Sequence, residues 1–184
     1  YLESQALRQD SRSEHDEGIG DFDSRPTHVH PKLTGLISLV SCITRLREVR
    51  ALMGFSRLEA ADPSARRKGD LARLSAVDQD WLPASEVRGE GIYIELSPER
   101  IASWEAMHEP IRLRAAQLNH NYMAMCAQRD WLAARKITPG LLLTHSFSHA
   151  LMRQLSLESG YSSTAIRERL YVFGPQEGHD EYPS

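Results

Sequence analysis

The sequence from residue 137 to residue 160 limits the fold more than any other part of the chain. The turn-forming ITPG at 137–140 leads into a helical pattern, and Gly160 suits the left-handed position that follows a helix C-terminus. On a helix, the apolar side chains of the intervening residues gather on one side: Leu143, Phe147, Ala150, Leu151, Leu155 and Leu157. The other side also carries small or apolar residues. We therefore predict a central helix at about 141–159, with elements packed on two of its sides.

Two histidines, His145 and His149, lie one helical turn apart on that other side. A pair at this spacing can bind zinc, but a zinc site needs three or four ligands, and catalytic examples usually place a glutamate between the histidines. Here the residues between them are Ser-Phe-Ser. If the fold brings one of them near, the third ligand could be His120, Cys126 or Glu158. We expect no metal ligands in this chain and predict hydrogen-bonded, structural polar roles for His145, His149 and Glu158.

The composition is that of an ordinary globular protein. Hydrophobic residues make up 41% and charged residues 26% of the 184 residues. No apolar run approaches the ~20 residues that a membrane-spanning helix needs, so we expect no membrane contact. The net charge of −3 gives no overall basic field for nucleic acid, and any such contact must come from local patches. Cys42 and Cys126 have no nearby cysteine, which fits a reducing compartment and excludes a zinc site built from cysteines within this chain.

Residues 1–31 are rich in Asp, Glu, Ser, Arg and His and have no sustained period. Turn residues in HDEGIGDFDSRPTHVHP favour a polar linker or a mobile loop. Histidines in this stretch have no spacing that fixes a metal geometry, so we expect solvated side chains. The start, YLES, has no signal-peptide pattern, and we expect it to lie inside a longer protein. The folded domain is then expected at 32–184.

Residues 36–53 have a helical pattern, because their apolar side chains share one arc on a 3.6-residue period. Arg47 and Arg50 fall inside or beside this arc. Each needs a carboxylate or a phosphate, because an unpaired buried charge is costly. One explanation is an internal ion pair, and the candidate partners are Glu86, Glu90 and Glu95. The other explanation is contact with a phosphate or a partner protein.

The middle of the chain predicts a strand followed by helices. GIYIEL, at 91–96, is rich in the β-branched and aromatic residues typical of strands. Ser97 is a good N-cap and Pro98 suits the first helical position, so a helix should begin there and continue towards Arg135 with a break near Pro110. Together these elements predict an α+β fold, mainly helical with a small β-sheet.

A basic run in ADPSARRKGD is one candidate for contact with DNA or a partner. It consists of Arg66, Arg67 and Lys68. Such a run attracts phosphate by charge alone, but it can equally be a solvated loop.

A second basic cluster follows the central helix. Arg167 and Arg169 are predicted to point from a short helix capped by a serine of YSST, with Arg153 upstream. These three arginines are the best candidate cluster for DNA or partner contact. The alternative is ion pairing with Glu158 and Glu168.

Three blocks of the sequence resemble a known family. They are RLREVRALMGFSRLEA (45–60), WLPASEVRGEGIYIEL (81–96) and HSFSHALMRQLSLESGYSSTAIRERLYVF (145–173). In this order they are similar to MZB-type helicase-associated domains, and among these to a component of the DISARM antiphage defence systems of bacteria. Residues 32–184 resemble the N-terminal part of such a domain.

The resemblance implies a large cytoplasmic protein that works with a DNA helicase and engages DNA. In DISARM that partner is DrmA, an ATP-driven helicase-like protein, so a DrmA-like DNA helicase is the expected partner. The family often continues into a Gly-rich β segment and a cysteine cluster thought to hold zinc. We expect zinc in that later part, beyond Ser184, and none in this chain. No catalytic residue is carried over from the family.

The expected function is therefore that of a non-catalytic, helicase-associated subunit whose partner hydrolyses ATP. No P-loop is present, and no pair of carboxylates has a setting that calls for acid–base chemistry. The alternative is a metal-dependent hydrolase or nuclease that uses His145 and His149. The lack of clustered carboxylates argues against two-metal nuclease chemistry, which needs acidic ligands for hard cations.

Overall fold

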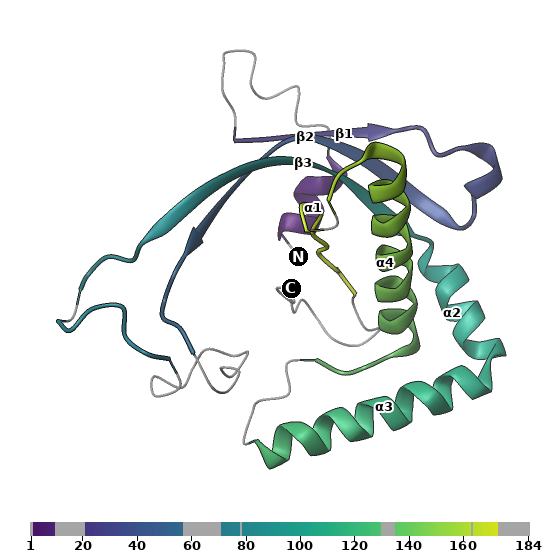
Figure 1. Cartoon of the computed structure of the whole chain (residues 1–184). Coiled ribbons are helices and arrows are strands. Elements are labelled where there is room, and N and C mark those ends of the chain that lie inside the picture. The colour runs from purple at the N-terminus through teal and green to yellow at the C-terminus, as the bar shows by residue number, and fades with distance from the viewer. Residues whose placement is uncertain are drawn as a thin grey trace. The chain divides into compact units, whose positions relative to one another are not determined.

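The computed structural model describes residues 2–9, 21–56, 71–77, 79–129, 135–162 and 164–172. Two compact units divide the chain: Leu2–Ser97, the sheet unit, and Pro98–Ser184, the helical unit. The sheet unit contains α1 (Leu2–Arg8), β1 (Phe22–Thr27), the 3-10 helix η2 (Pro31–Leu33), β2 (Ile37–Ala51) and β3 (Ala84–Leu96) (Figure 1). The helical unit contains α2 (Pro98–Met107), α3 (Glu109–Gln128) and α4 (Pro139–Ser159). These elements confirm the predicted α+β class.

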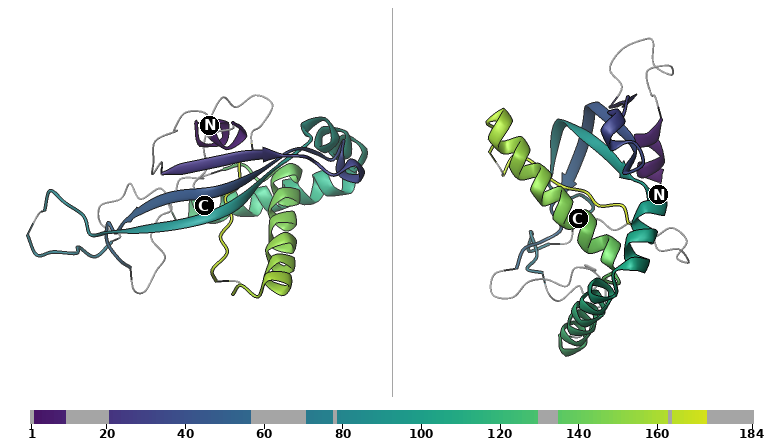
Figure 2. Two further views of the ribbon diagram at one scale, coloured as in Figure 1. Left: turned by 90° about the horizontal axis from the view of Figure 1, so that it is seen from above. Right: turned by 90° about the vertical axis from the view of Figure 1, so that its right-hand side faces the viewer.

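The three strands form an antiparallel sheet with β2 in the centre. Val40 of β2 lies between Thr27 of β1 and Ile94 of β3. A bulge interrupts the β2–β3 ladder between Ile43 and Leu46, and such bulges increase the local twist. The Arg47 N–H still donates to the Asp21 carbonyl at 2.9 Å. Among the described residues, β2 pairs with β3 alone beyond Arg47, so these two strands continue as a long hairpin (Figure 2).

The helix predicted at 36–53 is wrong, because these residues form β2. The pattern misleads because apolar residues of its arc are exposed: Leu36, Val49 and Met53 are 50%, 59% and 61% exposed. The alternation of the strand also changes phase at the bulge. Before it, the odd-numbered residues from 37 to 43 are shielded from solvent, and after it the even-numbered residues from 46 to 50 are shielded. The shielded side chains therefore alternate on each side of the bulge, as in a strand, but on a helix they would fall on two opposite sides. The strand predicted at 91–96 is confirmed and extends back to Ala84.

Helix α1 packs on β1 and β2. Leu7 of α1 and Ile43 of β2 are 6% and 7% exposed, and the buried Ser24 of β1 donates its hydroxyl hydrogen to the Leu7 carbonyl at 3.0 Å. Arg8 pairs with Glu95 of β3 at 2.8 Å. The sequence predicts a polar linker or mobile loop for residues 1–31. Within the described residues of this stretch the structure differs, because α1 and β1 form there and the buried Ser24 of β1 bonds to Leu7 of α1.

In the helical unit, α2 and α3 follow as predicted, with the break at His108 before Pro110. The three helices contact one another. Two side chains hold the backbone where α4 begins. Asn119 of α3 accepts a hydrogen bond from the Ile137 N–H at 2.8 Å, and Glu105 of α2 accepts one from the Gly140 N–H at 2.7 Å.

Helix α4 confirms the predicted helix at 141–159. The Thr138 hydroxyl caps it by accepting a hydrogen bond from the Leu141 N–H at 3.1 Å, and Gly160 ends it with φ of 72°. Its apolar side is less covered than the sequence predicts, since Leu157 is 72% exposed. No helix among the described residues, α4 included, combines the length and apolar character of a membrane span.

The short helix predicted around Arg167 and Arg169 is wrong. A single turn follows Gly160, in which the Ala165 N–H donates to the Ser162 carbonyl at 2.9 Å. Residues 166–172 have neither helix nor strand. They run alongside α4, where Glu168 contacts side chains of that helix. This tertiary contact is made in place of the backbone hydrogen bonds of the predicted short helix.

Candidate functional site

His145, His149 and Glu168 come together on one side of α4. The Nε2 atoms of the two histidines are 2.9 Å apart. Oε1 of Glu168 is 3.2 Å from Nε2 of His145 and 3.5 Å from Nε2 of His149. The imidazole rings are nearly perpendicular, with centroids 4.5 Å apart. Two imidazole nitrogens and one carboxylate oxygen thus face a single point.

Ser148 holds the carboxylate of this cluster. Its hydroxyl contacts Oε2 of Glu168, the oxygen that the histidines do not use. The same hydroxyl lies 2.8 Å from the carbonyl of His145. The side chains of His145 and His149 are 51% and 59% exposed, whereas that of Glu168 is 23% exposed. The carboxylate is therefore fixed from one side, and the histidines remain open to solvent.

Glu168 is the member of the cluster that the sequence does not identify. The sequence names it only as a possible partner of arginines, and the three residues considered as a third ligand lie elsewhere. Glu158 accepts a hydrogen bond from Gln154 at 2.6 Å, and Cys126 is buried in α3. Glu168 is 20 residues from Ser148, so its place depends on how the chain turns back after Gly160. Helical spacing carries no signal for such a return.

Arg153 and Arg167 are exposed, and neither has an ion pair or hydrogen bond with any residue that the structure describes. The expected alternative, pairing with Glu158 or Glu168, is not observed for these two arginines, since Gln154 and the histidines contact those carboxylates. Arg169 is exposed too, but it does interact within the chain. Residues 98–172 contain nine Arg and Lys against six Asp and Glu. Arg153 of α4 and Arg167 beside Glu168 are therefore two exposed cations without a partner among the described residues.

Arg47 and Arg50 differ, because both have carboxylate partners in the sheet unit. Arg47 lies 2.9 Å from Asp21 and 2.9 Å from Glu86, so one of its expected internal partners is confirmed. The hydrogen bond from Arg47, followed by one from Arg88, lowers the pKa of Glu86 below its ordinary value. Arg50 donates to Glu48 at 3.0 Å. The basic run Arg66, Arg67 and Lys68 lies outside the described residues.

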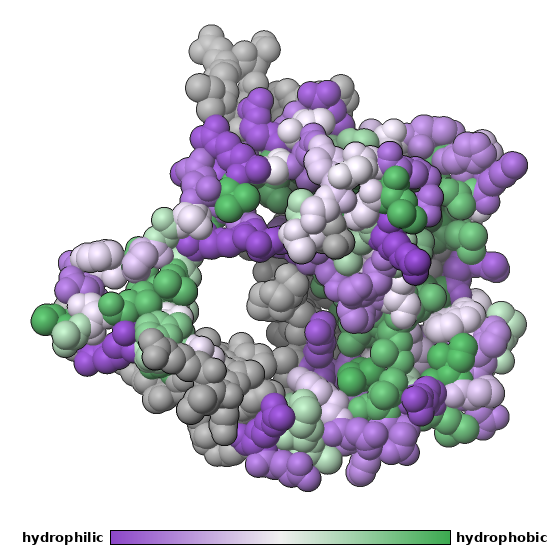
Figure 3. Space-filling model, viewed as in Figure 1, coloured by the Kyte–Doolittle hydropathy of each residue, from purple (hydrophilic) through white to green (hydrophobic). Residues whose placement is uncertain are grey.

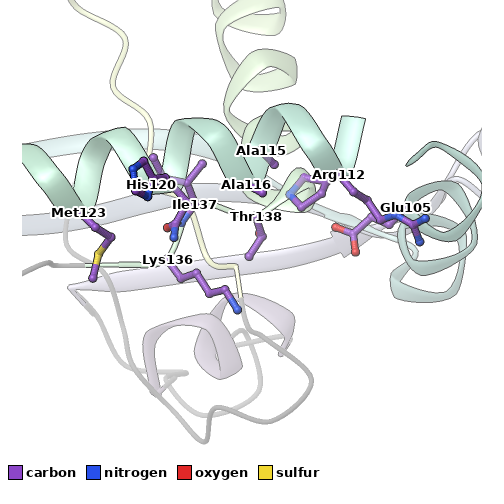
Figure 4. Close-up of a pocket in the computed structure, with 11 residues that line it drawn as sticks. Glu105, Arg112, Ala115, Ala116, His120, Met123, Lys136, Ile137 and Thr138 are labelled. Carbon is purple, nitrogen blue, oxygen red and sulfur yellow. The ribbon is translucent and has the colours of Figure 1, made fainter. Parts of the chain in front are cut away.

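A groove of about 490 Å³ lies between α3 and the residues that lead into α4 (Figure 4). His120 and Arg112 line it from α3, and Lys136 lines it from the connection, with Glu105 contributed by α2. His120, a possible third metal ligand by sequence, therefore belongs to this groove. The groove mixes basic and apolar side chains and shows no group aligned for a reaction.

Large hydrophobic side chains are exposed where the β2–β3 hairpin ends, as the hydrophobic surface there shows (Figure 3). Trp81 and Met53 are each 61% exposed. Backbone bonds close this end, since the Leu52 N–H donates to the Pro83 carbonyl at 2.8 Å and Phe55 pairs with Ala72. We call this surface the hairpin end: Leu52, Met53, Phe55, Leu74, Val77, Trp81 and Leu82.

Comparison with known proteins gives one informative relationship. No protein-family model matches the sequence. A curated relative from Bacillus paralicheniformis, named DISARM protein DrmB, is 31% identical over 154 residues. This chain is homologous to part of DrmB. The match covers 83% of the chain and 28% of the relative, so the chain spans less than a third of the length of that DrmB.

The DrmB match confirms the resemblance to a DISARM component that the three sequence blocks carry. Its 154 residues exceed the length of either unit, so the homology includes parts of both the sheet unit and the helical unit. Membership of DrmB in the MZB-type domain family stays a prediction.

Proposed function

We propose that this chain is part of a bacterial antiphage defence protein of the DrmB type. In this proposal it is a non-catalytic subunit that docks on a DrmA-like DNA helicase and helps to engage DNA. The observation that carries the proposal is the 31% identity to DISARM protein DrmB over 83% of the chain.

Docking is assigned to the hairpin end in the sheet unit. Exposed apolar patches on soluble proteins often mark interaction sites, and tryptophan is enriched among residues that dominate binding energy. Trp81 at 61% and Val77 at 68% exposed stand on a hairpin of 15- and 13-residue strands. A projecting hairpin of this kind can place an apolar surface into a recess on a partner.

DNA engagement is assigned to the helical unit. Arg153 and Arg167 have no partner among the described residues, whereas Arg47 and Arg50 have carboxylates within 3.0 Å. An arginine that already pairs with a carboxylate must give up that ion pair to bind phosphate, whereas an arginine without a partner loses no such interaction. The proposal therefore concentrates the contact on Arg153 and Arg167.

The docking half is tested by measuring the affinity of the full-length protein for its helicase partner. Trp81→Ala removes the largest exposed apolar side chain of the hairpin end, and we expect at least a 30-fold weaker complex, the effect of a residue worth about 2 kcal/mol. Leu113→Ala is the matched control, since Leu113 is 64% exposed on α3. Equal affinities for the two variants would remove docking from the hairpin end.

The DNA half is tested by binding of the full-length protein to DNA across a salt series. For Arg153→Ala with Arg167→Ala, the slope of log K against log salt should become shallower by about 0.9 for each duplex phosphate that the variant no longer binds. Arg25→Ala with Arg88→Ala changes the charge equally, but those arginines are paired with Asp23 and Glu86. If the two double variants change the slope equally, the effect comes from net charge alone and the assignment to Arg153 and Arg167 fails.

A further inference from the structure

The three facing atoms of His145, His149 and Glu168 have the spacing of metal ligands. Their separations are 2.9, 3.2 and 3.5 Å, and all lie within 4.8 Å of one another. A tetrahedral zinc ion with bonds of about 2.0–2.1 Å holds its ligand atoms about 3.3–3.4 Å apart. The triangle therefore matches one face of a tetrahedral site without any rearrangement of α4.

Protons cannot satisfy all three of these contacts at once. Each Nε2 atom carries at most one hydrogen, and an ionised carboxylate only accepts hydrogen bonds. If both histidines donate to Glu168, their two N–H groups oppose each other across 2.9 Å. If one histidine donates to the other, one contact with Glu168 joins two acceptors. A cation in the centre of the triangle would accept a lone pair from all three atoms.

The surroundings of the triangle support a ligand role as well. Ser148 contacts the second oxygen of Glu168, leaving Oε1 for the shared point. Such hydrogen bonds to ligating carboxylates orient them and tune the metal. The exposure of both histidines leaves room for a water molecule at a fourth position. Two imidazoles with one carboxylate suit zinc and its first-row neighbours, whereas calcium and magnesium prefer oxygen alone.

We propose that His145, His149 and Glu168 bind one divalent transition-metal ion, with zinc as the reference ion and the fourth position open to solvent. The site ties Glu168 to two histidines of α4, so the metal orders the segment that carries Arg167. This inference goes beyond the helicase-associated function, because it requires neither DNA nor a partner.

The test measures zinc stoichiometry and affinity on full-length protein that has been stripped with a chelator and carries no histidine tag. We expect Glu168→Gln and His149→Ala to bind one zinc ion fewer than the wild type. Cobalt should give the wild type, but not these variants, the visible absorption of an additional tetrahedral site with nitrogen and oxygen ligands. Ser148→Ala should retain the ion with about 10-fold lower affinity.

Two matched controls separate this site from unrelated metal binding. His120→Ala removes a histidine on α3, and Glu158→Gln changes a carboxylate of α4 itself, which accepts a hydrogen bond from Gln154. Both should bind as much zinc as the wild type. Hydrogen exchange of α4 verifies that each variant is folded. The proposal is overturned if His149→Ala, with α4 folded, keeps the full zinc content. A loss with His149→Ala but not with Glu168→Gln overturns the three-ligand set.

Discussion

The sheet unit and the helical unit use their carboxylates differently, and this difference decides which arginines are available. In the sheet unit, Asp21 and Glu86 both contact Arg47. In the helical unit, Glu105 instead accepts a hydrogen bond from the backbone of α4, and Glu168 contacts two histidines.

The consequence is a sheet surface whose arginines are largely neutralised and a helical surface that keeps unpaired cations. Among the described residues of the sheet unit, ion pairs with carboxylates of the same unit include those of Arg8, Arg25, Arg47, Arg50 and Arg88. Neither Arg153 nor Arg167 of the helical unit has an ion pair with a carboxylate among the residues that the structure describes. A count of charges alone would miss this contrast.

The largest effect is expected when a carboxylate with a structural role in the helical unit is removed. Glu105→Ala leaves the N–H of the buried Gly140 without its acceptor, which should cost about 1–3 kcal/mol. Hydrogen exchange should show faster exchange at the start of α4. Glu105→Gln keeps an oxygen acceptor and should lose less. Unchanged exchange in the alanine variant would show that Glu105 is as dispensable as a surface charge.

A smaller effect is expected from the second cap of the same helix. Thr138→Ala removes the acceptor for the Leu141 N–H, and loss of such a cap costs about 1 kcal/mol. Exchange in the first turn of α4 should accelerate less than with Glu105→Ala. Thr138→Ser preserves the hydroxyl and is the control. A larger effect than that of Glu105→Ala would reverse the order of the two caps.

Removal of a sheet-unit ion pair should change stability least among the substitutions. Arg47 is exposed, and surface ion pairs contribute little because water and salt screen them. Arg47→Ala should leave the denaturant midpoint of the sheet unit unchanged. It should also let the pKa of Glu86 rise towards its ordinary value, since the hydrogen bond from Arg47 is the main cause of its depression. A clear loss of stability would mean that the pairing has a structural role.

Acid pH offers a finer test of a different carboxylate contact in the sheet unit, that of Asp23 with Thr44. The hydrogen bond from Thr44, at 2.5 Å, is the main cause of a pKa of Asp23 below its ordinary 3.8. A depressed carboxyl pKa contributes stability that is present above the ordinary value and is lost as the pH falls through the lowered one. Thr44→Val should therefore begin acid unfolding of the sheet at a higher pH, followed by circular dichroism. Identical acid transitions would separate Asp23 from sheet stability.

The sequence predicts those parts of the fold that depend on local signals. Thr138, Gly160 and Pro110 mark the helix boundaries, because capping and backbone geometry act within a few residues. The strand at 37–51 is missed because apolar residues that it exposes, such as Cys42 and Val49, complete a helical arc, and because the bulge interrupts the alternation of period two. Alternation of period two holds on each side of the bulge separately, and only the β-branched residues indicate a strand throughout.

The candidate site divides in the same way. His145 and His149 follow from helical spacing, whereas Glu168 enters through a turn whose path is set by contacts with α4. The arginine partners are likewise a matter of register, since Arg47 meets Glu86 across the β2–β3 ladder. Spacing along one element is visible in a sequence, but the meeting of two segments depends on tertiary packing.

The bulge in β2 also limits how this hairpin can change by insertion or deletion. Because alternate side chains of a strand point to opposite faces, removal of one residue between Ile43 and Leu46 would merge two alternation phases into one. The side chains of one half of β2, either the half that packs on α1 or the half that leads to Trp81, would then point to the opposite face of the sheet. Lengthening the hairpin by two residues beyond Arg50 would preserve both faces and only extend its reach. The hairpin can therefore change in length at its far end in steps of two residues, whereas the bulge fixes the number of residues in the part of β2 nearer to β1.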